Sequence, residues 1–391
     1  MPVSIRSIGT AVPPTVIRQP DVRDLFRSQP GLGRLAPRLI GAVFDASGIE
    51  TRHTVVDELG VAGGDVPVPR GPEDGVPDGP VFVDQDGRVL APTTGVRNAE
   101  YVARSPDLFG RAAEAALAGA AGVEASDVTH VVTVSCTGFF APGPDYLLVR
   151  RLGLAPSTRR LHIGFMGCYG AFPALRAARD TCLAEPDAVV LVVCAELCTL
   201  HLRSSDDPDA IVASSVFADG AAAAVVSARP APAGSTVLDL DVLESVLTPV
   251  GEDDMAWSIG DQGFDMVLSS YVPHIVEENI DDALVPLLAA AGCSIADVER
   301  WAVHPGGRSI LDRVEKRLGL SAEQLAPSRD VLRRHGNMSS ATVLFILQQH
   351  LEAAGGAAPV ALPPTTSRVC AMAFGPGLTV ETALLTRRTT S

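Results

Sequence analysis

The feature that most constrains the fold of this chain is an internal repeat. The segment AAGVEASDV at residues 120–128 matches AAGCSIADV at residues 290–298, which lies 170 residues further along. In both copies a helical pattern ends at a glycine, a short turn follows, and Asp-Val leads into an apolar strand. Two copies of one unit in a single chain predict two similar halves.

A second pair of segments repeats at almost the same spacing. Gly167-Cys168 and Gly336-Asn337 each open a helical stretch that runs on to an apolar strand, AVVLVVCA in the first copy and RVCAMAF in the second. Two independent pairs that share one spacing make a chance similarity improbable. We therefore expect Cys168 and Asn337 to face each other across a pseudo-twofold axis.

The repeat divides the chain into two βαβ-type halves, residues 1–230 and residues 235–391, joined at the RPAPAG segment. Ala-rich helical patterns alternate with short β-branched runs, for example residues 111–121 followed by residues 128–134, and this alternation predicts α/β layers. Residues 60–97 are rich in Gly, Pro and Asp and predict a long surface excursion. A dispensable insertion and a functional flap are equally consistent with that composition.

Composition and charge exclude several classes of protein. The chain has 391 residues, of which 47% are hydrophobic, enough for a large core, and its formal net charge of −15 without a basic run disfavours nucleic-acid binding. The longest apolar run, residues 188–195, fits a buried strand and falls short of the ~20 residues of a spanning helix. No signal-peptide pattern is visible at the N-terminus, and the seven cysteines lack paired spacing. We expect reduced thiols and a cytoplasmic protein.

Cys168 is the first candidate for chemistry. It lies in GFMGCYGAFPALRAARD, where glycines at positions 164, 167 and 170 permit a tight turn from strand to helix. A thiol at a helix N-terminus lies near the positive end of the dipole, which favours the nucleophilic thiolate. A buried structural cysteine is an equally good interpretation of this segment taken alone.

Two further residues support the catalytic interpretation when they are taken together with Cys168. His304 follows a strand in WAVHPGGRSIL, and Asn337 follows a glycine in HGNMSSATVLFIL. Singly, the histidine is more typical of a structural hydrogen-bonding residue and the asparagine of a helix cap. Together the three supply a nucleophile, a base and an amide donor, which suits thioester chemistry. Metal binding fits poorly, because Cys194 and Cys198 lack a second ligand pair at a matching spacing.

These segments resemble a known family. The stretch around Cys168, HPGG at His304, GNMSSATVLFIL at Asn337, FADGAAAAVV at Phe217 and AFGPGLTVET near the C-terminus are similar to the type III polyketide synthases. These are the chalcone synthase-like enzymes of the thiolase superfamily. The likeness covers the start of the chain and most of it from about Val128 onward, and it is vague over the Gly/Pro-rich excursion.

The resemblance implies a thiolase-like αβαβα fold and a homodimer. Cys168 would accept an acyl group from a coenzyme A (CoA) starter. His304 would assist thiolate formation and, with Asn337, stabilise the enolate formed when malonyl-CoA loses CO2. The chain would then cyclise to a pyrone, resorcinol or phloroglucinol type ring. No metal, redox cofactor, acyl carrier protein, nucleic acid or membrane is implied as a partner.

The resemblance also implies a substrate pocket whose wall departs from the plant pattern. Phe217 keeps a gatekeeping phenylalanine, whereas flexible Met266 replaces a second aromatic gatekeeper and Trp257 stands where plant enzymes carry glycine. Ala141 replaces a methionine that enters the neighbouring subunit's cavity. The other pocket positions implied by the resemblance are Cys136, Thr137, Cys198, His201 and Ser339. We therefore expect a product different from plant chalcone.

The lysines that bind CoA in the family are missing here. The candidates that remain for CoA contacts are Arg52, Gly306, Gly307 and Arg308. A structural loop is expected at Gly375, Pro376 and Gly377.

Two alternatives remain open at this point. A ketoacyl synthase of the KAS III type shares Cys, His and Asn, but it typically differs around the histidine and has a shorter chain. A non-catalytic thiolase-fold partner subunit would be expected to lack one of the three residues. The sequence does not define the starter, the number of extensions or the mode of cyclisation.

Overall fold

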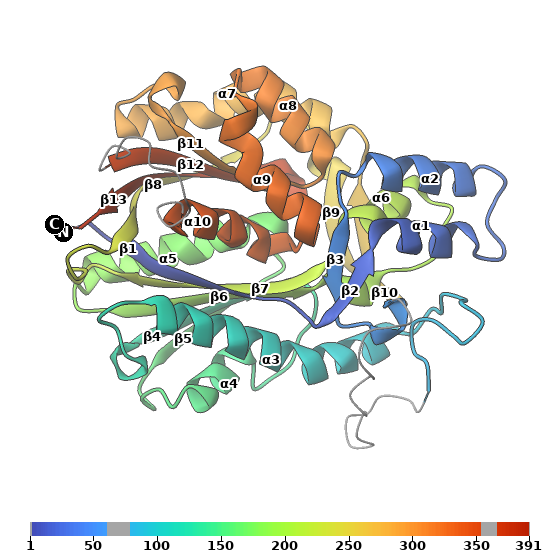
Figure 1. Cartoon of the computed structure of the whole chain (residues 1–391), viewed down its shortest axis with the longest axis horizontal. Coiled ribbons are helices and arrows are strands. Elements are labelled where there is room, and N and C mark those ends of the chain that lie inside the picture. Colours follow the sequence, from blue (N-terminus) through green and yellow to red (C-terminus); the bar gives the residue numbers. More distant parts are fainter. Residues whose placement is uncertain (1, 61–78, 353–365, 391) are drawn as a thin grey trace, which may run out of the picture.

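The computed structural model describes residues 2–60, 79–352 and 366–390. Its centre is a nine-stranded sheet in the order β11-β12-β13-β8-β1-β7-β6-β4-β5 (Figure 1). The strands of this sheet are β1 (Ser4–Ala11), β4 (His130–Ser135), β5 (Arg159–Gly164), β6 (Val189–Leu197), β7 (Asp219–Ser227), β8 (Thr236–Leu247), β11 (Arg300–Val303), β12 (Thr366–Gly375) and β13 (Thr379–Thr389).

The strand order repeats outward from the centre of the sheet. On one side β1 is followed by β7, β6 and β4, and on the other side β8 is followed by β13, β12 and β11. The directions match as well, because β4 is parallel to β6 and β11 is parallel to β12, while the other neighbours among these eight strands are antiparallel. Strand β5 extends the first side and is parallel to β4. The two sides join where Ser4 and Ile5 of β1 pair with Asp239 and Leu238 of β8.

Local structure repeats at the segments that the sequence singled out. The helices of the structure are α1 (Gln19–Arg27), α2 (Ala36–Ala46), α3 (Thr94–Gly119), α4 (Pro144–Arg151), α5 (Ala171–Ala184), α6 (Pro208–Val216), α7 (Val272–Ala291), α8 (Arg308–Leu318), α9 (Ala322–His335) and α10 (Thr342–Glu352). After α3 a 3-10 turn begins with a capping box between Glu124 and Asp127, and after α7 an equivalent turn has a capping box between Ser294 and Asp297. The repeat is thus visible both in the turns and in the strand order.

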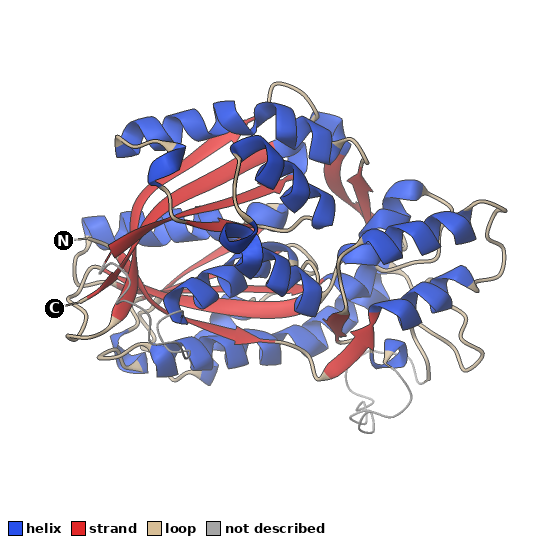
Figure 2. Ribbon diagram, turned by 45° about the horizontal axis from the view of Figure 1, so that its top comes forward, coloured by secondary structure: helices blue, strands red, loops and turns tan. Residues whose placement is uncertain are grey.

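Five layers result from this arrangement. The two sides of the sheet face each other with α5 and α10 between them, while α3 and α4 cover one outer face and α7, α8 and α9 the other (Figures 1 and 2). Strands β6 and β7 are buried along their whole length, as expected of strands covered on both faces. The predicted thiolase-like αβαβα fold is therefore confirmed. Among the described residues no helix is long and apolar enough to cross a membrane.

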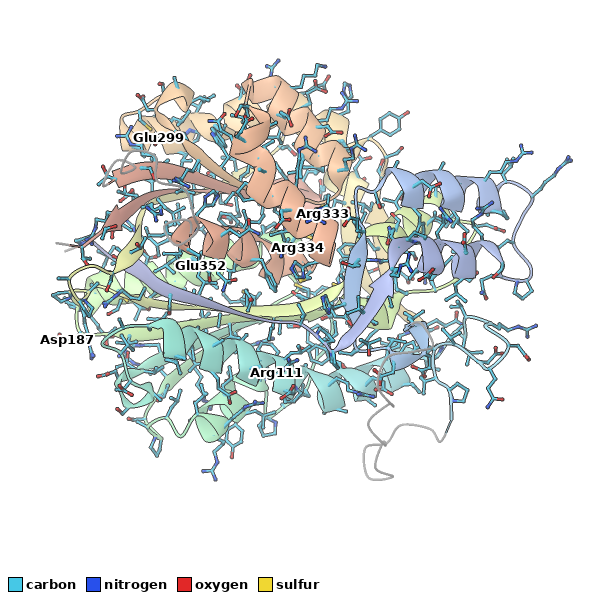
Figure 3. All side chains as sticks on the ribbon, viewed as in Figure 1. Arg111, Asp187, Glu299, Arg333, Arg334 and Glu352 are labelled. Atoms are coloured by element: carbon cyan, nitrogen blue, oxygen red, sulfur yellow. The ribbon has the colours of Figure 1, made fainter. Side chains whose placement is uncertain are left out.

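Charged side chains lie on the outside of these layers. Figure 3 shows Arg111 on α3, Arg333 on α9, Asp187 and Glu299 in loops, and Glu352 at the end of the inner helix α10. They surround a core that is mainly apolar but also encloses charged side chains such as Arg52, Glu196 and Asp219.

The surface excursion predicted over residues 60–97 is shorter than expected. Residues 61–78 lie outside the described residues, but Val81, Phe82 and Val83 are buried in the core beside α3. Helix α3 already begins at Thr94, because the Thr93 hydroxyl accepts a hydrogen bond from the Val96 amide. The sequence-based prediction placed this helix start too late because Gly and Pro dominate the segment before it. A single threonine is enough to cap a helix, and its signal is weak beside so many Gly and Pro residues.

Two smaller units lie at one end of the molecule. Strand β2 (Thr15–Arg18) pairs with β3 (Thr51–Thr54), and helices α1 and α2 pack beside them around their own small core. The hairpin of β9 (Met255–Gly260) and β10 (Gly263–Leu268) lies next to α6 (Figure 1). These units cover the end of the main sheet at which Cys168 and Asn337 lie.

Candidate active site

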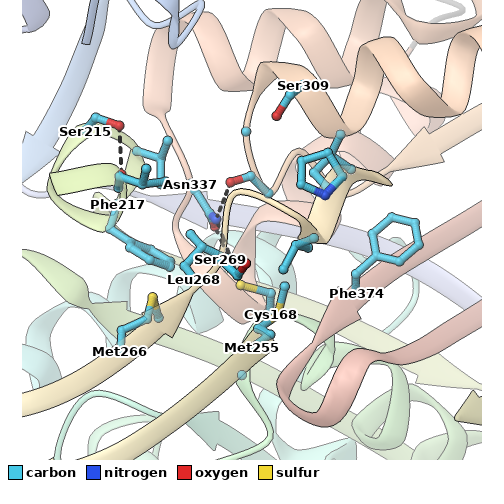
Figure 4. A pocket seen from close by; sticks show the side chains of 18 of the residues that line it. Cys168, Ser215, Phe217, Met255, Met266, Leu268, Ser269, Ser309, Asn337 and Phe374 are labelled. Atoms are coloured by element: carbon cyan, nitrogen blue, oxygen red, sulfur yellow. Dashed lines mark hydrogen bonds between the residues drawn. The ribbon is translucent and has the colours of Figure 1, made fainter. Parts of the chain in front are cut away.

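A largely apolar cavity of about 370 Å³ opens where the two halves meet. Cys168 and Asn337 line this cavity, and Phe217, Met255 and Met266 lie around them, carried by the end of α6 and the β9–β10 hairpin (Figure 4). A concave apolar site with a few polar groups is the usual form of a small-molecule site.

Cys168 and Asn337 face each other, as the repeat predicted. The Cys168 Sγ lies 3.9 Å from both Oδ1 and Nδ2 of Asn337. The asparagine amide is itself oriented by two hydrogen bonds. The Ser339 amide donates to Oδ1 at 2.8 Å, and Nδ2 donates to the Gly306 carbonyl at 3.4 Å. The amide N–H groups of Asn337 therefore point toward the thiol and the loop that carries His304.

The turn that carries Cys168 requires a glycine at the preceding position, Gly167. Cys168 lies in a 3-10 turn, Gly167–Tyr169, and Gly167 has φ = +71°, a conformation that favours glycine. A Cβ on Gly167 would lie 2.4 Å from Cδ of Pro376, and a Cβ on Gly375 would lie 2.4 Å from the ring of Tyr169. The loop predicted at Gly375, Pro376 and Gly377 thus packs directly behind the nucleophile and lets the backbone approach closely.

The pKa of the Cys168 thiol differs from the sequence-based expectation. Burial raises the pKa of Cys168 to about 11, although hydrogen bonds with Ser339 and Asn337 act in the opposite direction. The expectation that a helix N-terminus lowers this pKa is wrong for two reasons. Helix α5 begins only at Ala171, and the side chain is almost fully enclosed. Loss of hydration outweighs a partial dipole charge at that depth.

His304 follows β11 and is fully buried. Neither ring nitrogen has a hydrogen-bond partner among the described residues, and burial lowers the pKa of the imidazole to about 3. The ring is therefore neutral, and its one N–H donor and one acceptor have no partner among the described residues. The ring does not contribute to the cavity wall, whereas Gly306 and Gly307 of the same loop do.

Most of the predicted pocket residues line the cavity. Those that do so are Cys136, Thr137, Cys198, Phe217, Trp257, Met266 and Ser339. His201 lies instead on a small adjoining cavity of about 30 Å³, whose wall it shares with Trp257 and Met266. The indole of Trp257 meets the His201 ring edge-on, with centroids 5.8 Å apart. Four residues line both cavities and separate them: Cys198, Phe217, Trp257 and Met266.

Sequence reasoning missed Glu196. Its buried carboxylate accepts hydrogen bonds from the Ser340 hydroxyl at 2.6 Å, the Cys136 amide at 2.9 Å and the Thr137 hydroxyl at 2.9 Å. Burial raises its pKa to about 7. The available signal was a single acidic residue inside the apolar strand VVLVVCAEL, since an unpaired glutamate is rare in a core.

Comparison with known proteins identifies the family. Residues 87–230 match the N-terminal domain of the chalcone and stilbene synthases, and residues 239–389 match their C-terminal domain. The chain belongs to this family of type III polyketide synthases.

Relatives with known names agree with this assignment. The chain is 36% identical over 261 residues to the alpha-pyrone synthesis polyketide synthase-like Pks18 of Mycobacterium tuberculosis, a match that covers 66% of this chain and 64% of that relative. The structure is similar to PKS-I of the brown alga Ectocarpus siliculosus, with a TM-score of 0.86, 30% identity and coverage of 99% and 98% of the two chains. It is also similar to the 1,3,6,8-tetrahydroxynaphthalene synthase of Streptomyces coelicolor A3(2), with a TM-score of 0.80, 27% identity and coverage of 99% and 100%.

Of the four residues expected to contact CoA, three line the cavity. Arg308 lines the cavity together with Gly306 and Gly307, and its side chain is 57% exposed. His274 and Arg313, which sequence reasoning missed, line the same cavity and add basic groups beside Arg308. Each of these three groups has an acidic neighbour: Asp312 for Arg308, Glu277 for Arg313 and Glu278 for His274.

Arg52 does not bind CoA, so that expectation is wrong. Its side chain is fully buried, and Nη1 donates hydrogen bonds to the backbone carbonyls of Ser214 and Phe217. A guanidinium enclosed in this way cannot reach a phosphate in the cavity.

Proposed function

We propose that the chain transfers an acyl group from a CoA starter to Cys168, extends it with malonyl-CoA and cyclises the product in the same cavity. The observation that carries this proposal is the 3.9 Å approach of the Cys168 thiol to the Asn337 amide inside an apolar cavity. A thiol beside an oriented amide donor, with an unpartnered imidazole on the adjoining loop, is suited to thioester chemistry.

Acyl loading in this proposal starts from a neutral thiol and a neutral imidazole. As the starter enters, His304 accepts the Cys168 proton, the sulfur attacks the thioester carbon, and the CoA thiolate leaves with the proton that His304 held. Transfer between neutral groups avoids a permanent ion pair in a buried site, where isolated charges are costly.

Extension follows by loss of CO2 from malonyl-CoA. The carbon–carbon bond breaks, and its electron pair becomes an enolate whose oxygen accepts hydrogen bonds from the Asn337 amide and a His304 N–H. The enolate carbon attacks the Cys168 thioester, and the cysteine thiolate is expelled. This route needs CoA thioesters as substrates and requires no metal or redox cofactor.

Ring formation follows in the same cavity. The candidates are a pyrone, a resorcinol or a phloroglucinol type ring. The relative described as an alpha-pyrone synthesis enzyme supports the pyrone.

A homodimer is also part of the proposal. Strand β5 forms one edge of the nine-stranded sheet, and Leu161 in that strand is 46% exposed. Phe139, on the loop after the neighbouring β4, is 40% exposed. An open edge with apolar side chains is a common site of strand pairing between two copies of a chain.

The experiment that tests the function is incubation of purified protein with malonyl-CoA and a panel of aromatic and aliphatic acyl-CoAs, followed by mass spectrometry. We expect polyketide products from CoA thioesters alone. Activity that requires an acyl carrier protein would favour the KAS III alternative. A folded protein that forms no acyl-enzyme with any starter would favour the non-catalytic partner subunit.

A further inference from the structure

Arg52 occupies a position from which it holds the end of helix α6. Its Nη1 donates to the Ser214 carbonyl at 2.9 Å and to the Phe217 carbonyl at 2.6 Å. Helix α6 ends at Val216, so these carbonyls belong to the last turn and the residue that caps it. Carbonyls at a helix end have no partner within the helix, and a buried one without a donor is costly. The guanidinium supplies that donor and places a positive charge at the negative end of the helix dipole.

The same helix end also fixes the backbone of Asn337. The Asn337 amide donates to the Val216 carbonyl at 2.8 Å, and the Asn337 carbonyl accepts from the Ala218 amide at 2.9 Å. Phe217 and Asn337 thus form a parallel β-bridge. One of these residues carries a side chain of the cavity wall, and the other carries the amide beside Cys168.

The stem of Arg52 contacts the residue before Asn337. A Cβ on Gly336 would lie 2.9 Å from Cγ and 3.0 Å from Cδ of Arg52, so arginine stem and glycine backbone are closely packed. On its other side the guanidinium carbon lies 5.9 Å from the ring centroid of Phe44. Arg52 is therefore held from both sides while it holds the end of α6.

The charge of Arg52 has little freedom to act elsewhere. The acid that acts on it is Asp219, which is fully buried and accepts hydrogen bonds from Thr199 and the Val55 amide. The Nη1 of Arg52 has the Ser214 and Phe217 carbonyls as acceptors, whereas Nε and Nη2 have no partner among the described residues, and the side chain is fully buried.

We propose that Arg52 is a positioning residue that sets Phe217 and Asn337 together through the last turn of α6. This inference rests on the proposed function, because Asn337 acts there on the malonyl thioester and Phe217 bounds the growing chain. Loss of the two hydrogen bonds would let the turn relax and move both residues at once. Misplacement of a catalytic group by about 1 Å can cost ~10² in rate.

The test compares Arg52→Met and Arg52→Lys with the parent enzyme. Arg52→Met keeps the buried stem and removes the donors, whereas Arg52→Lys keeps the charge but reaches less far. For Arg52→Met we expect kcat to fall by about 10² with little change in KM, and the ratio of product lengths to change. Arg52→Lys is expected to restore part of kcat. Malonyl-CoA decarboxylation, measured separately with Cys168→Ala as the background, should fall by a similar factor because it depends on Asn337.

Arg387 provides a matched control. It is also buried, and its Nε donates to the His350 carbonyl at 2.7 Å, but β13, which carries it, contributes no described residue to the cavity wall. Arg387→Met should lower the melting temperature without changing the product ratio or the decarboxylation rate.

Three outcomes overturn the positioning role. One is a folded Arg52→Met enzyme with parental kcat and products. Another is an Arg52→Met enzyme whose changes in melting temperature, kcat and product ratio match those of Arg387→Met. Where Arg52→Met does not fold, a folded Arg52→Lys enzyme with parental kcat and products is the third. Failure of the proposed function is distinguishable, because the parent enzyme would then form no product from malonyl-CoA and any acyl-CoA.

Discussion

The indole Nε1 of Trp257 donates a hydrogen bond to the carbonyl oxygen of Cys136 at 3.0 Å. This bond joins the β9–β10 hairpin of the C-terminal half to the loop after β4 in the N-terminal half. The hydrogen bond holds the indole in the cavity wall. Met266, the cross-strand partner of Trp257 in the hairpin, lines the same cavity. The side chain of Trp257 therefore lies at the cavity and not in the hydrophobic core.

Replacement of Trp257 by glycine should enlarge the space for the growing chain. The indole lines both the main cavity and the small adjoining cavity, so we expect its removal to join them. We expect Trp257→Gly to give longer polyketides or to accept bulkier starters. Product masses from matched reactions check this, together with a melting curve to show that the variant is folded.

Trp257→Phe is the control for volume, because it keeps an aromatic ring and loses the hydrogen bond to Cys136. Its products should lie between those of the parent and Trp257→Gly. An unchanged product spectrum from a folded Trp257→Gly enzyme would contradict a role in limiting size.

Decarboxylation should be separable from acyl loading. Cys168→Ala removes the acyl acceptor but leaves His304 and Asn337, so it should still convert malonyl-CoA to acetyl-CoA. Asn337→Ala removes one donor to the enolate, and a loss of this kind typically costs ~10²–10³ in rate. Acetyl-CoA release, followed by chromatography, gives both rates. If Asn337→Ala decarboxylates as fast as the parent enzyme, the role given to the amide is wrong.

Alkylation of Cys168 should depend steeply on pH. Because burial raises the pKa of this thiol to about 11, its thiolate fraction at neutral pH is small and grows about tenfold per pH unit. Iodoacetamide inactivation should therefore be slow at mildly acidic pH and accelerate continuously from pH 7 to pH 10. A rate that is already constant above pH 7 would show a preformed thiolate.

Peptide mapping identifies the thiol that reacts. Cys136 and Cys198 also line the cavity, but burial raises the pKa of each well above its usual value. Cys168 should be modified first, and Cys168→Ser should be resistant. Modification of another cysteine with equal loss of activity would contradict the assignment of the nucleophile.

Glu196 should make the protein less stable as pH rises. Burial raises its pKa to about 7, above the value near 4.5 expected in the unfolded chain, so the folded state holds the proton more tightly. The free energy of unfolding should therefore fall between about pH 4.5 and pH 7. Urea unfolding of the parent and Glu196→Gln at pH 5 and pH 8 measures this.

Asp219 provides an internal check on the Glu196 experiment. Burial raises the pKa of Asp219 to about 6, so Asp219 lowers the free energy of unfolding by a similar amount in the parent and in Glu196→Gln as pH rises. The difference between the two proteins therefore measures the contribution of Glu196 alone. Glu196→Gln stays neutral at both pH values and should show the smaller change. If the free energy of unfolding falls equally in the two proteins between pH 5 and pH 8, Glu196 is already ionised in the folded state at pH 5.

Much of the fold and the facing of Cys168 and Asn337 could be predicted from the sequence. The repeat constrained both, because equivalent segments of two similar halves must occupy equivalent places. The local signals were strong as well, since Gly167 and its turn lie beside the nucleophile. The chemistry of the pair could be anticipated because it depends on residue type and on this facing.

Other features depended on burial, which the sequence does not show. Arg52 carries the same side chain whether it meets a phosphate or a helix end, and only its complete enclosure decides between them. The pKa of Cys168 was misjudged for the same reason. Glu196 and Arg313 belong to segments with no motif of their own, and they reach the site only through the packing of distant strands and helices.

The repeated strand order has a consequence for the symmetry of this site. Positions 168 and 337 lie at equivalent places in the two halves, so a symmetric pair of identical halves would place the same residue at both. A nucleophile and an amide can face each other here only because the two halves carry different residues at these places. The site is therefore asymmetric within a nearly symmetric fold.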